Sequence, residues 1–262
     1  MQLQPVLTIA GTDPSGGAGA MADLKSFQQR AVYGMAVITS VVAQNTQGVK
    51  QIEHCSLAMV KSQLDCVYSD ILPKAVKTGM LPTAACMQVI KPYLDRQDIP
   101  YVMDPVMVAT SGDALSSSSA QETLMDEIVP LTTLVTPNIP EAETLSAMKI
   151  TSASDIEKAG YRIIHERGAK AVIIKGGHLE GQAVDYLFTK EGLVHTWTSH
   201  RIATENTHGT GCTFSAVITA ELGKGKDLLE AIHIGKQFIT AAIEQNPDLG
   251  HGHGPVNHCV RV

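Results

Sequence analysis

Val6-Leu7-Thr8-Ile9-Ala10 decides the fold together with the turn that follows it, Gly11-Thr12-Asp13-Pro14-Ser15-Gly16-Gly17-Ala18-Gly19. A short apolar, partly β-branched run of this kind is typical of a buried parallel strand. The turn leads into a helix expected over residues 20–30, and its glycines let the backbone approach a ligand closely. Because the turn lacks both the G-x-G-x-x-G spacing of dinucleotide sites and the lysine and hydroxyl residues of a P-loop, neither site is predicted.

The alternation of strand and helix continues along the chain. Residues 184–188 and 193–197 alternate around Lys190-Glu191-Gly192, which predicts an antiparallel hairpin at the sheet edge. Further strands are expected at residues 35–42, 75–77, 101–103, 134–137 and 171–174, and helices at 57–69, 84–94, 155–166 and 227–243. This order predicts an α/β fold with a mainly parallel sheet covered on both faces. With no repeat and no linker in the sequence, we expect one domain over residues 1–262.

Composition narrows the classes of function. The chain has 262 residues, a formal net charge of -6 and a pI near 5.9. Its lysines and arginines are scattered, so a nucleic-acid partner is not expected. The five cysteines include no C-x-x-C pair, which argues against zinc and fits the reducing cytoplasm. No apolar run reaches the roughly 20 residues of a membrane span, and the expected ligand is a small molecule.

The stretch His208-Gly209-Thr210-Gly211-Cys212-Thr213-Phe214-Ser215-Ala216-Val217 is the strongest candidate for chemistry. It reads as a loop that enters a helix, with an amphipathic run over residues 213–222. A helix N-terminus offers unpaired N–H groups and a partial positive charge, which suit phosphate. Cys212 lies in the first turn, where the helix dipole favours the thiolate and so a base for phosphoryl transfer to an alcohol. The alternative is an ordinary turn with a buried cysteine that acts as a small hydrophobe.

Polar residues follow several of the expected strands, at the edge where open parallel sheets bind ligands. The Gln44 side-chain amide can donate and accept hydrogen bonds at once, which suits the edge of an aminopyrimidine. A lone glutamine in a turn is, however, more often without function. Asp104 suits magnesium or phosphate chemistry, or an ordinary turn before proline. Asn138 and Glu141 can share a hydrated Mg²⁺ or cap a helix, and the two roles are compatible. Lys175 reaches a phosphate, or lies solvated in its loop.

Two further segments carry weaker signals. Residues 109–113, which read Ala109-Thr110-Ser111-Gly112-Asp113, are small and polar and suit a mobile lid. The tail holds His251, His253 and His258, but their flexible spacing and the absence of acidic neighbours favour a surface turn over a metal site.

Several motifs occurring in order resemble the hydroxymethylpyrimidine/phosphomethylpyrimidine kinases of thiamine synthesis, in the ribokinase superfamily. The resemblance implies a ribokinase-like three-layer α/β/α sandwich, a cytoplasmic homodimer, and ATP with Mg²⁺ as cofactors. It also implies two successive phosphorylations, of 4-amino-5-hydroxymethyl-2-methylpyrimidine and of its monophosphate. The motifs are residues 10–19, Val42-Ala43-Gln44-Asn45-Thr46, Lys77-Thr78-Gly79-Met80, Asp104-Pro105-Val106-Met107, Thr136-Pro137-Asn138, Lys175-Gly176-Gly177-His178, His208-Gly209-Thr210-Gly211-Cys212-Thr213 and Gly254-Pro255-Val256-Asn257-His258.

The resemblance also assigns roles to individual residues. Gln44 holds the pyrimidine and Cys212 is the catalytic residue beside an anion hole. The pocket for the substrate is implied to include Gly11, Ala18, Asp23, Val42, Met80 and Val106. The anion hole is Gly209, Thr210 and Gly211; ATP is served by Lys175, Asn138 and Thr210, and magnesium by Glu141, Asn138 and Asp104.

Departures from related families separate the alternatives. Sugar kinases of the superfamily carry aspartate where Cys212 stands, and the pyrimidine branch resembles this sequence instead. Members often read Gly-Ile-Gln before Ala22-Asp23-Leu24-Lys25, where this chain has Ala20-Met21, a change that helix packing should absorb. Pyridoxal kinases tend to carry methionine in place of Gln44 and a cysteine in the lid, so the pyrimidine is favoured over vitamin B6 salvage. A catalytically silent ligand-binding regulator is a third hypothesis, which the intact phosphate motifs oppose.

Overall fold

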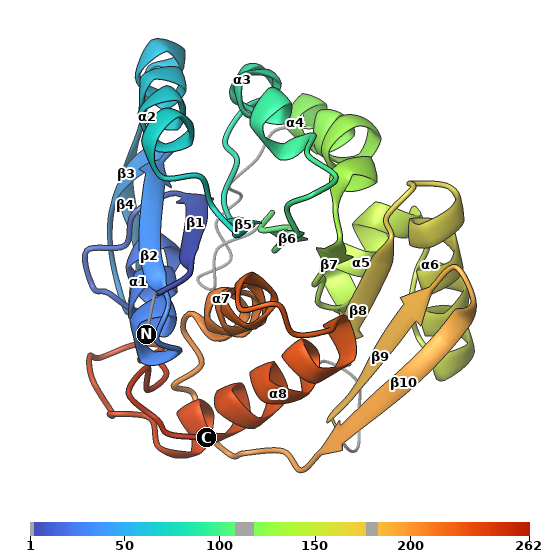
Figure 1. Ribbon diagram of the computed structural model, residues 1–262. Coiled ribbons are helices and arrows are strands. Elements are labelled where there is room, and N and C mark those ends of the chain that lie inside the picture. The colour runs from blue at the N-terminus through green and yellow to red at the C-terminus, as the bar shows by residue number, and fades with distance from the viewer. Residues whose placement is uncertain (1–2, 108–117, 177–182) are drawn as a thin grey trace.

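The computed structural model describes residues 3–107, 118–176 and 183–262. Its centre is an eight-stranded sheet in the order β10-β9-β8-β7-β6-β5-β1-β2 (Figure 1). Neighbouring strands along β8-β7-β6-β5-β1-β2 pair in parallel, and β9 and β10 complete one edge in antiparallel pairing. This confirms the predicted parallel sheet with an antiparallel edge hairpin. The strands are β1 (Pro5–Ala10), β2 (Tyr33–Ile38), β5 (Ala75–Thr78), β6 (Tyr101–Met103), β7 (Leu134–Val135), β8 (Ala171–Lys175), β9 (Ala183–Thr189) and β10 (Gly192–Ser199).

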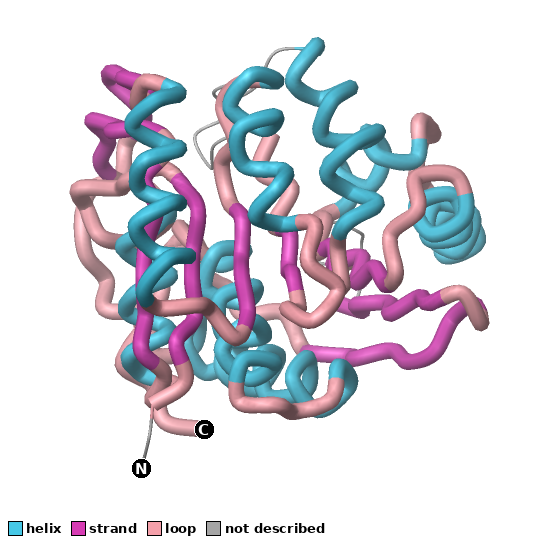
Figure 2. Tube along the Cα trace, turned by 45° about the horizontal axis from the view of Figure 1, so that its top comes forward, coloured by secondary structure: helices cyan, strands magenta, loops and turns pink. Residues whose placement is uncertain are grey.

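Helices cover both faces of the sheet, as Figure 2 shows. Five of the predicted helices, over residues 20–30, 57–69, 84–94, 155–166 and 227–243, form within about two residues of the expected ends. The helices are α1 (Gly19–Gln29), α2 (Leu57–Asp70), α3 (Ala84–Leu94), α4 (Ser118–Thr123), α5 (Ile139–Ser146), α6 (Ala153–His165), α7 (Thr210–Gly223) and α8 (Leu228–Glu244). A π-helical turn (Leu124–Ile128) and a 3-10 turn (Val129–Leu131) continue α4.

The apolar core is divided by the sheet into two clusters. Val6 belongs to the cluster beneath α1, α7 and α8, whereas Leu7 belongs to the cluster beneath α2, α3, α5 and α6. The same division separates Ala75 from Val76 on β5. Successive side chains of a strand point to opposite faces, so a continuous apolar run fills both clusters. This explains why the central strands read as uninterrupted hydrophobic sequence.

Helix α7 is the central helix of its layer and differs from the amphipathic helix that we expected. Every residue from Thr213 to Gly223 is buried, because α1, α8 and the sheet surround the helix. Two of its polar side chains are satisfied within the helix: the hydroxyls of Ser215 and Thr219 donate to carbonyls one turn earlier, at 2.9 and 2.7 Å. A helix that is apolar on all sides lies in the core, and the first turn of α7 is thereby held rigidly against the sheet.

A small hairpin replaces the second half of the strand predicted over residues 35–42. The main strand ends at Ile38, and the Thr39 hydroxyl donates to the Met80 carbonyl at 2.9 Å. The chain then forms β3 (Ser40–Asn45), which pairs with β4 (Gly48–His54) in a separate two-stranded sheet. Gln44 therefore lies on a strand of this hairpin rather than in a turn after a strand. The exposure of Val41, at 57%, shows that the apolar run was not buried throughout.

Three further sequence predictions concern the lid, the C-terminal tail and membrane spans. The lid at residues 109–113 lies outside the described residues, as do Gly177 and His178. The surface turn predicted for the tail is wrong for His258, which is buried, with a pKa that burial lowers to about 4. Among the described residues no helix is long and apolar enough to cross a membrane.

Candidate active site

One large cavity of about 1070 Å³ lies at the carboxyl ends of the central strands. It is the place where a doubly covered parallel sheet is expected to bind its ligand. The cavity collects residues that are far apart in the sequence and that follow β1, β5, β6, β7 and β8. The predicted site residues in its wall are Gly11, Ala18, Val42, Gln44, Met80, Asp104, Val106, Asn138, Glu141, Lys175, Gly209, Thr210, Gly211 and Cys212.

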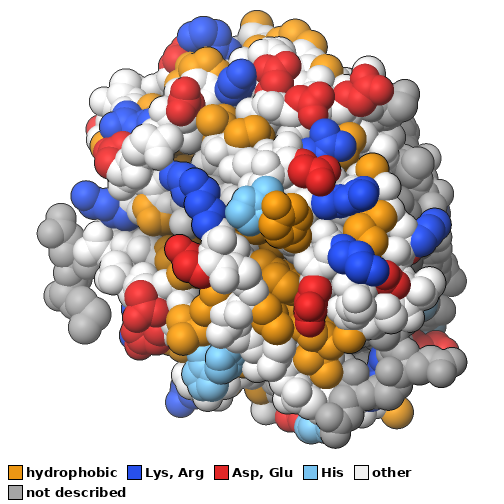
Figure 3. All heavy atoms as spheres, turned by 90° about the vertical axis from the view of Figure 1, so that its right-hand side faces the viewer, with side chains coloured by type: hydrophobic (Ala, Val, Ile, Leu, Met, Phe, Trp, Pro, Cys, Tyr) orange, Lys and Arg blue, Asp and Glu red, His pale blue; other side chains and the backbone are white. Residues whose placement is uncertain are grey.

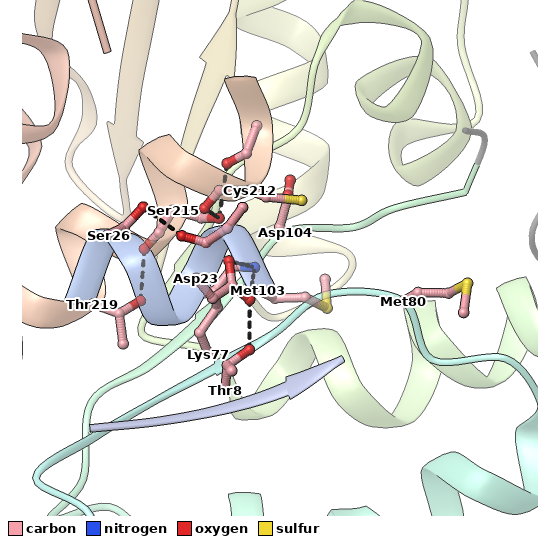
Figure 4. A network of polar contacts seen from close by, with 12 residues as sticks. Thr8, Asp23, Ser26, Lys77, Met80, Met103, Asp104, Cys212, Ser215 and Thr219 are labelled. Atoms are coloured by element: carbon pink, nitrogen blue, oxygen red, sulfur yellow. Dashed lines mark hydrogen bonds and ion pairs between the residues drawn. The ribbon is translucent and has the colours of Figure 1, made fainter. Parts of the chain in front are cut away.

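Asp23 is the predicted site residue that the structure places elsewhere. Its side chain is fully buried, and both carboxylate oxygens accept hydrogen bonds from the Lys77 ammonium at 2.8 Å. The Thr8 hydroxyl donates to the same carboxylate at 2.6 Å. Figure 4 shows Asp23 between these two partners, which come from β5 and β1. With its oxygens engaged by Lys77 and Thr8, Asp23 has no part in the cavity wall, so the structure does not place it among the residues that would line a substrate site.

The N-terminus of α7, residues 209–212, lines the cavity. Gly209 caps the helix with a φ of 80°, and a Cβ at this position would lie 1.7 Å from the Gly17 carbonyl oxygen. Only glycine fits there. The first N–H groups of a helix have no partner within it, and they carry the positive end of the helix dipole. The loop therefore offers the features expected of an anion cradle, and that role stays a prediction.

Charged side chains face this cradle. A Cβ on Gly211 would lie 3.3 Å from the Asp104 carboxylate and 3.3 Å from the Lys175 ammonium, and these two groups are 3.7 Å apart. Burial lowers the pKa of Lys175, but the carboxylates of Asp104 and Glu141 outweigh burial and raise it. The ammonium is therefore charged at neutral pH, close to where an anion would meet the helix end.

Asn138 and Glu141 form the capping box that the sequence offered as one of their two roles. The Glu141 N–H donates to the Asn138 side-chain oxygen at 2.9 Å, and the Asn138 N–H donates to the Glu141 carboxylate at 2.8 Å. Burial raises the pKa of Glu141 to about 7; Lys175 lowers it and Asp104 raises it further. With oxygen ligands on Asp104, Asn138 and Glu141 along one wall, the donor set has the hard chemistry that Mg²⁺ prefers.

The Cys212 thiol is less acidic than the sequence predicted. It lies half-buried in the cavity wall, in the first turn of α7. Burial raises its pKa to about 12, although Lys77 and the Gly19 N–H oppose the shift. The helix dipole was expected to favour the thiolate, but loss of hydration and the carboxylates of Asp104 and Asp23 outweigh it. The unliganded protein therefore holds a neutral thiol at this position.

Other groups in the cavity wall were missed by sequence reasoning. Lys236, in the middle of α8, forms an ion pair of 2.6 Å with Asp185, which also accepts from the Gly176 N–H at 3.0 Å. Nothing in the local sequence marks this pair, because its members are 51 residues apart. On the face shown in Figure 3, acidic and basic side chains are interspersed around apolar ones, with no single-sign patch.

Comparison with known proteins gives a consistent result. A family model described as phosphomethylpyrimidine kinase matches residues 13–257. A hydroxymethylpyrimidine/phosphomethylpyrimidine kinase of Staphylococcus aureus (strain MRSA252) is 55% identical over 255 residues, covering 96% of this chain and 92% of that protein. The ADP complex of Bacillus subtilis pyridoxal kinase superposes with a TM-score of 0.90 at 39% identity, covering 98% of both chains. The phosphomethylpyrimidine kinase of Clostridium difficile 630 gives a TM-score of 0.81 at 41% identity, covering 92% of this chain and 99% of that one.

Proposed function

The chain belongs to the phosphomethylpyrimidine kinase family, and on this premise we propose how its cavity performs two phosphorylations. The substrate is 4-amino-5-hydroxymethyl-2-methylpyrimidine, and its monophosphate is the second acceptor. The observation that carries the proposal is the meeting of Gln44, Cys212 and the N-terminus of α7 in one cavity. Phosphoryl transfer needs an acceptor site, an anion cradle and a proton acceptor within reach of one another, and the cavity wall holds all three.

The pyrimidine is proposed to bind between the β3–β4 hairpin and the glycine-rich turn. Gln44 would pair with the ring edge, because its amide both donates and accepts. Met80 and Val106 supply apolar surface for the ring, and Gly11 and Ala18 let it approach the backbone. This placement directs the hydroxymethyl group toward Cys212.

The family's use of ATP supports a proposal in which the transferred phosphate lies at the N-terminus of α7. Lys175 is charged and lies against Gly211, where it would neutralise phosphate oxygens. The Gly211 and Cys212 N–H groups would receive the charge that develops during transfer. Asp104, Asn138 and Glu141 would hold Mg²⁺, which would supply positive charge that neutralises the phosphates.

Cys212 is proposed to accept the proton of the alcohol. Because burial raises the pKa of its thiol to about 12, only a small fraction is ionised at neutral pH. A base role therefore predicts a rate that increases with pH. A role limited to holding the alcohol in place predicts no such dependence.

Pyridoxal kinase is the second candidate function, because the solved pyridoxal kinase of B. subtilis superposes along the full chain. A silent regulator is disfavoured, because a sensor has no need of the cradle and of the charged Lys175 beside it. The deciding experiment compares kcat/KM for the hydroxymethylpyrimidine, its monophosphate and pyridoxal under identical ATP and Mg²⁺. Preference for the two pyrimidines supports the proposal. Preference for pyridoxal would move the protein to vitamin B6 salvage, and no turnover with any of the three would support the regulator.

The resemblance also implies a cytoplasmic homodimer, which we keep as a proposal. Light scattering of the purified protein tests the dimer, and fractionation of cells that express it tests the compartment.

A further inference from the structure

The Asp13 carboxylate is fully buried and fully engaged. One oxygen accepts from the Ser15 N–H at 2.9 Å and from the Ser15 hydroxyl at 2.7 Å. The other accepts from the N–H groups of Gly17 and Ala18 at 3.1 and 2.8 Å and contacts His208 Nε2 at 2.7 Å. Burial raises the pKa of Asp13, but the hydrogen bonds from His208 and Ser15 outweigh it and hold the pKa well below its usual range. With its acceptor sites filled, this carboxylate binds no substrate or metal.

His208 directly precedes Gly209, the residue that caps α7. Its backbone is held on both sides by the C-terminal tail: its N–H donates to the Gly254 carbonyl at 3.0 Å, and its carbonyl accepts from the Val256 N–H at 3.2 Å. Its ring is held by Asp13, 195 residues earlier in the chain. The start of the anion cradle is thus tied to the tail through the backbone and to the glycine-rich turn through one side-chain contact.

The two loops also pack closely against each other at two glycines, Gly17 and Gly209. A Cβ on Gly17 would lie 2.5 Å from the His208 ring and 3.0 Å from the Pro255 side chain. A Cβ on Gly209 would meet the Gly17 carbonyl oxygen at 1.7 Å. Close packing of this kind transmits displacement, so a shift of His208 moves Gly209 and the helix start that follows it.

We propose that Asp13 and His208 are positioning residues that set the distance between the two walls of the active site. One wall, which includes Gly11, Ala18 and Gly19, faces the acceptor alcohol, and the other is the cradle of residues 209–212. The inference rests on the proposed function, because it concerns the alignment of alcohol and phosphate in that reaction. Asp13 has no part in the cavity wall; His208 belongs to that wall, but its Nε2 is engaged by Asp13. Loss of the contact should therefore lower kcat and leave the binding of each substrate nearly unchanged.

The test compares His208→Ala, which removes the contact, with His208→Gln, whose amide nitrogen still reaches Asp13. A misplacement of about 1 Å costs on the order of 10²-fold in rate, so we expect His208→Ala to lower kcat by about that factor. KM for the pyrimidine and the calorimetric Kd for ADP should stay within about threefold, and His208→Gln should recover most of the rate. In a double-mutant cycle, adding Asp13→Asn to His208→Ala should cost little more than either change alone.

The matched control is Arg30→Gln, which breaks the ion pair of the partly buried Arg30 with the buried Glu221, at 2.7 Å, near the opposite end of α7. It should lower the melting temperature and leave kcat unchanged. If His208→Ala keeps kcat within about threefold of wild type, or if Arg30→Gln loses as much kcat, the positioning role is refuted. An inactive wild type with intact ADP binding would refute the proposed function instead, so the two failures are distinguishable.

Discussion

The Asp23→Asn substitution leaves the Lys77 ammonium buried without its counter-ion. Both side chains are fully buried, and the ammonium donates to both carboxylate oxygens at 2.8 Å. Burial lowers the pKa of Lys77, but Asp23 outweighs burial and raises it, so the lysine stays charged in the folded protein. Removing one partner of a buried pair costs about 3–5 kcal/mol, and we expect the variant to lose that much free energy of unfolding.

Urea unfolding at pH 7, fitted with a common slope, measures this loss. Asp65→Asn is the matched control. Asp65 pairs with Lys61 at 2.7 Å, close to the 2.8 Å of the Asp23–Lys77 pair, but the side chains of Asp65 and Lys61 are both more than half exposed. An exposed pair contributes about 0–1 kcal/mol, so the control should change little. Asp23→Leu combined with Lys77→Met should recover much of the loss, because apolar residues can replace a buried pair. A loss below about 1 kcal/mol in the free energy of unfolding for Asp23→Asn would refute the reasoning. A raised KM without destabilisation would also refute it and would indicate that Asp23 binds the substrate.

Three more outcomes follow from the site. Cys212→Ala should lower kcat by about two to four decades and abolish an increase of kcat between pH 7 and 9 at saturating Mg²⁺; a loss under about threefold would exclude the base role. Glu141→Gln keeps the capping box but removes the titrating carboxyl. Since the pKa of Glu141 is raised to about 7 in the folded protein, the wild type should lose stability as the pH rises from about 4.5 to 7. The variant should lack that loss, on the order of 2 kcal/mol, in thermal unfolding without ligand; equal slopes would contradict the shift. Gln44→Met should shift the kcat/KM ratio from pyrimidine toward pyridoxal by about tenfold or more, and an unchanged ratio would show that Gln44 does not set specificity.

Sequence patterns were sufficient for most of the architecture. The strands and helices follow from periodicity and from glycine-rich turns, which are local properties of the chain. The polar residues after the strands could be assigned to one site because the carboxyl ends of parallel strands share an edge. The hairpin of β3 and β4 was missed because Val41 and Val42 look alike in sequence, although one is exposed and the other buried.

Local sequence patterns were enough to predict the doubly covered parallel sheet and the meeting of Gln44, Lys175 and Cys212 in one cavity. Which charges are buried and paired is a property of the folded chain alone. Asp23 meets Lys77 across 54 residues and Asp13 meets His208 across 195, so neither partner is visible in a local pattern. The pKa of a thiol depends on its hydration and on all charges around it, and for Cys212 these outweigh the helix dipole that the sequence shows.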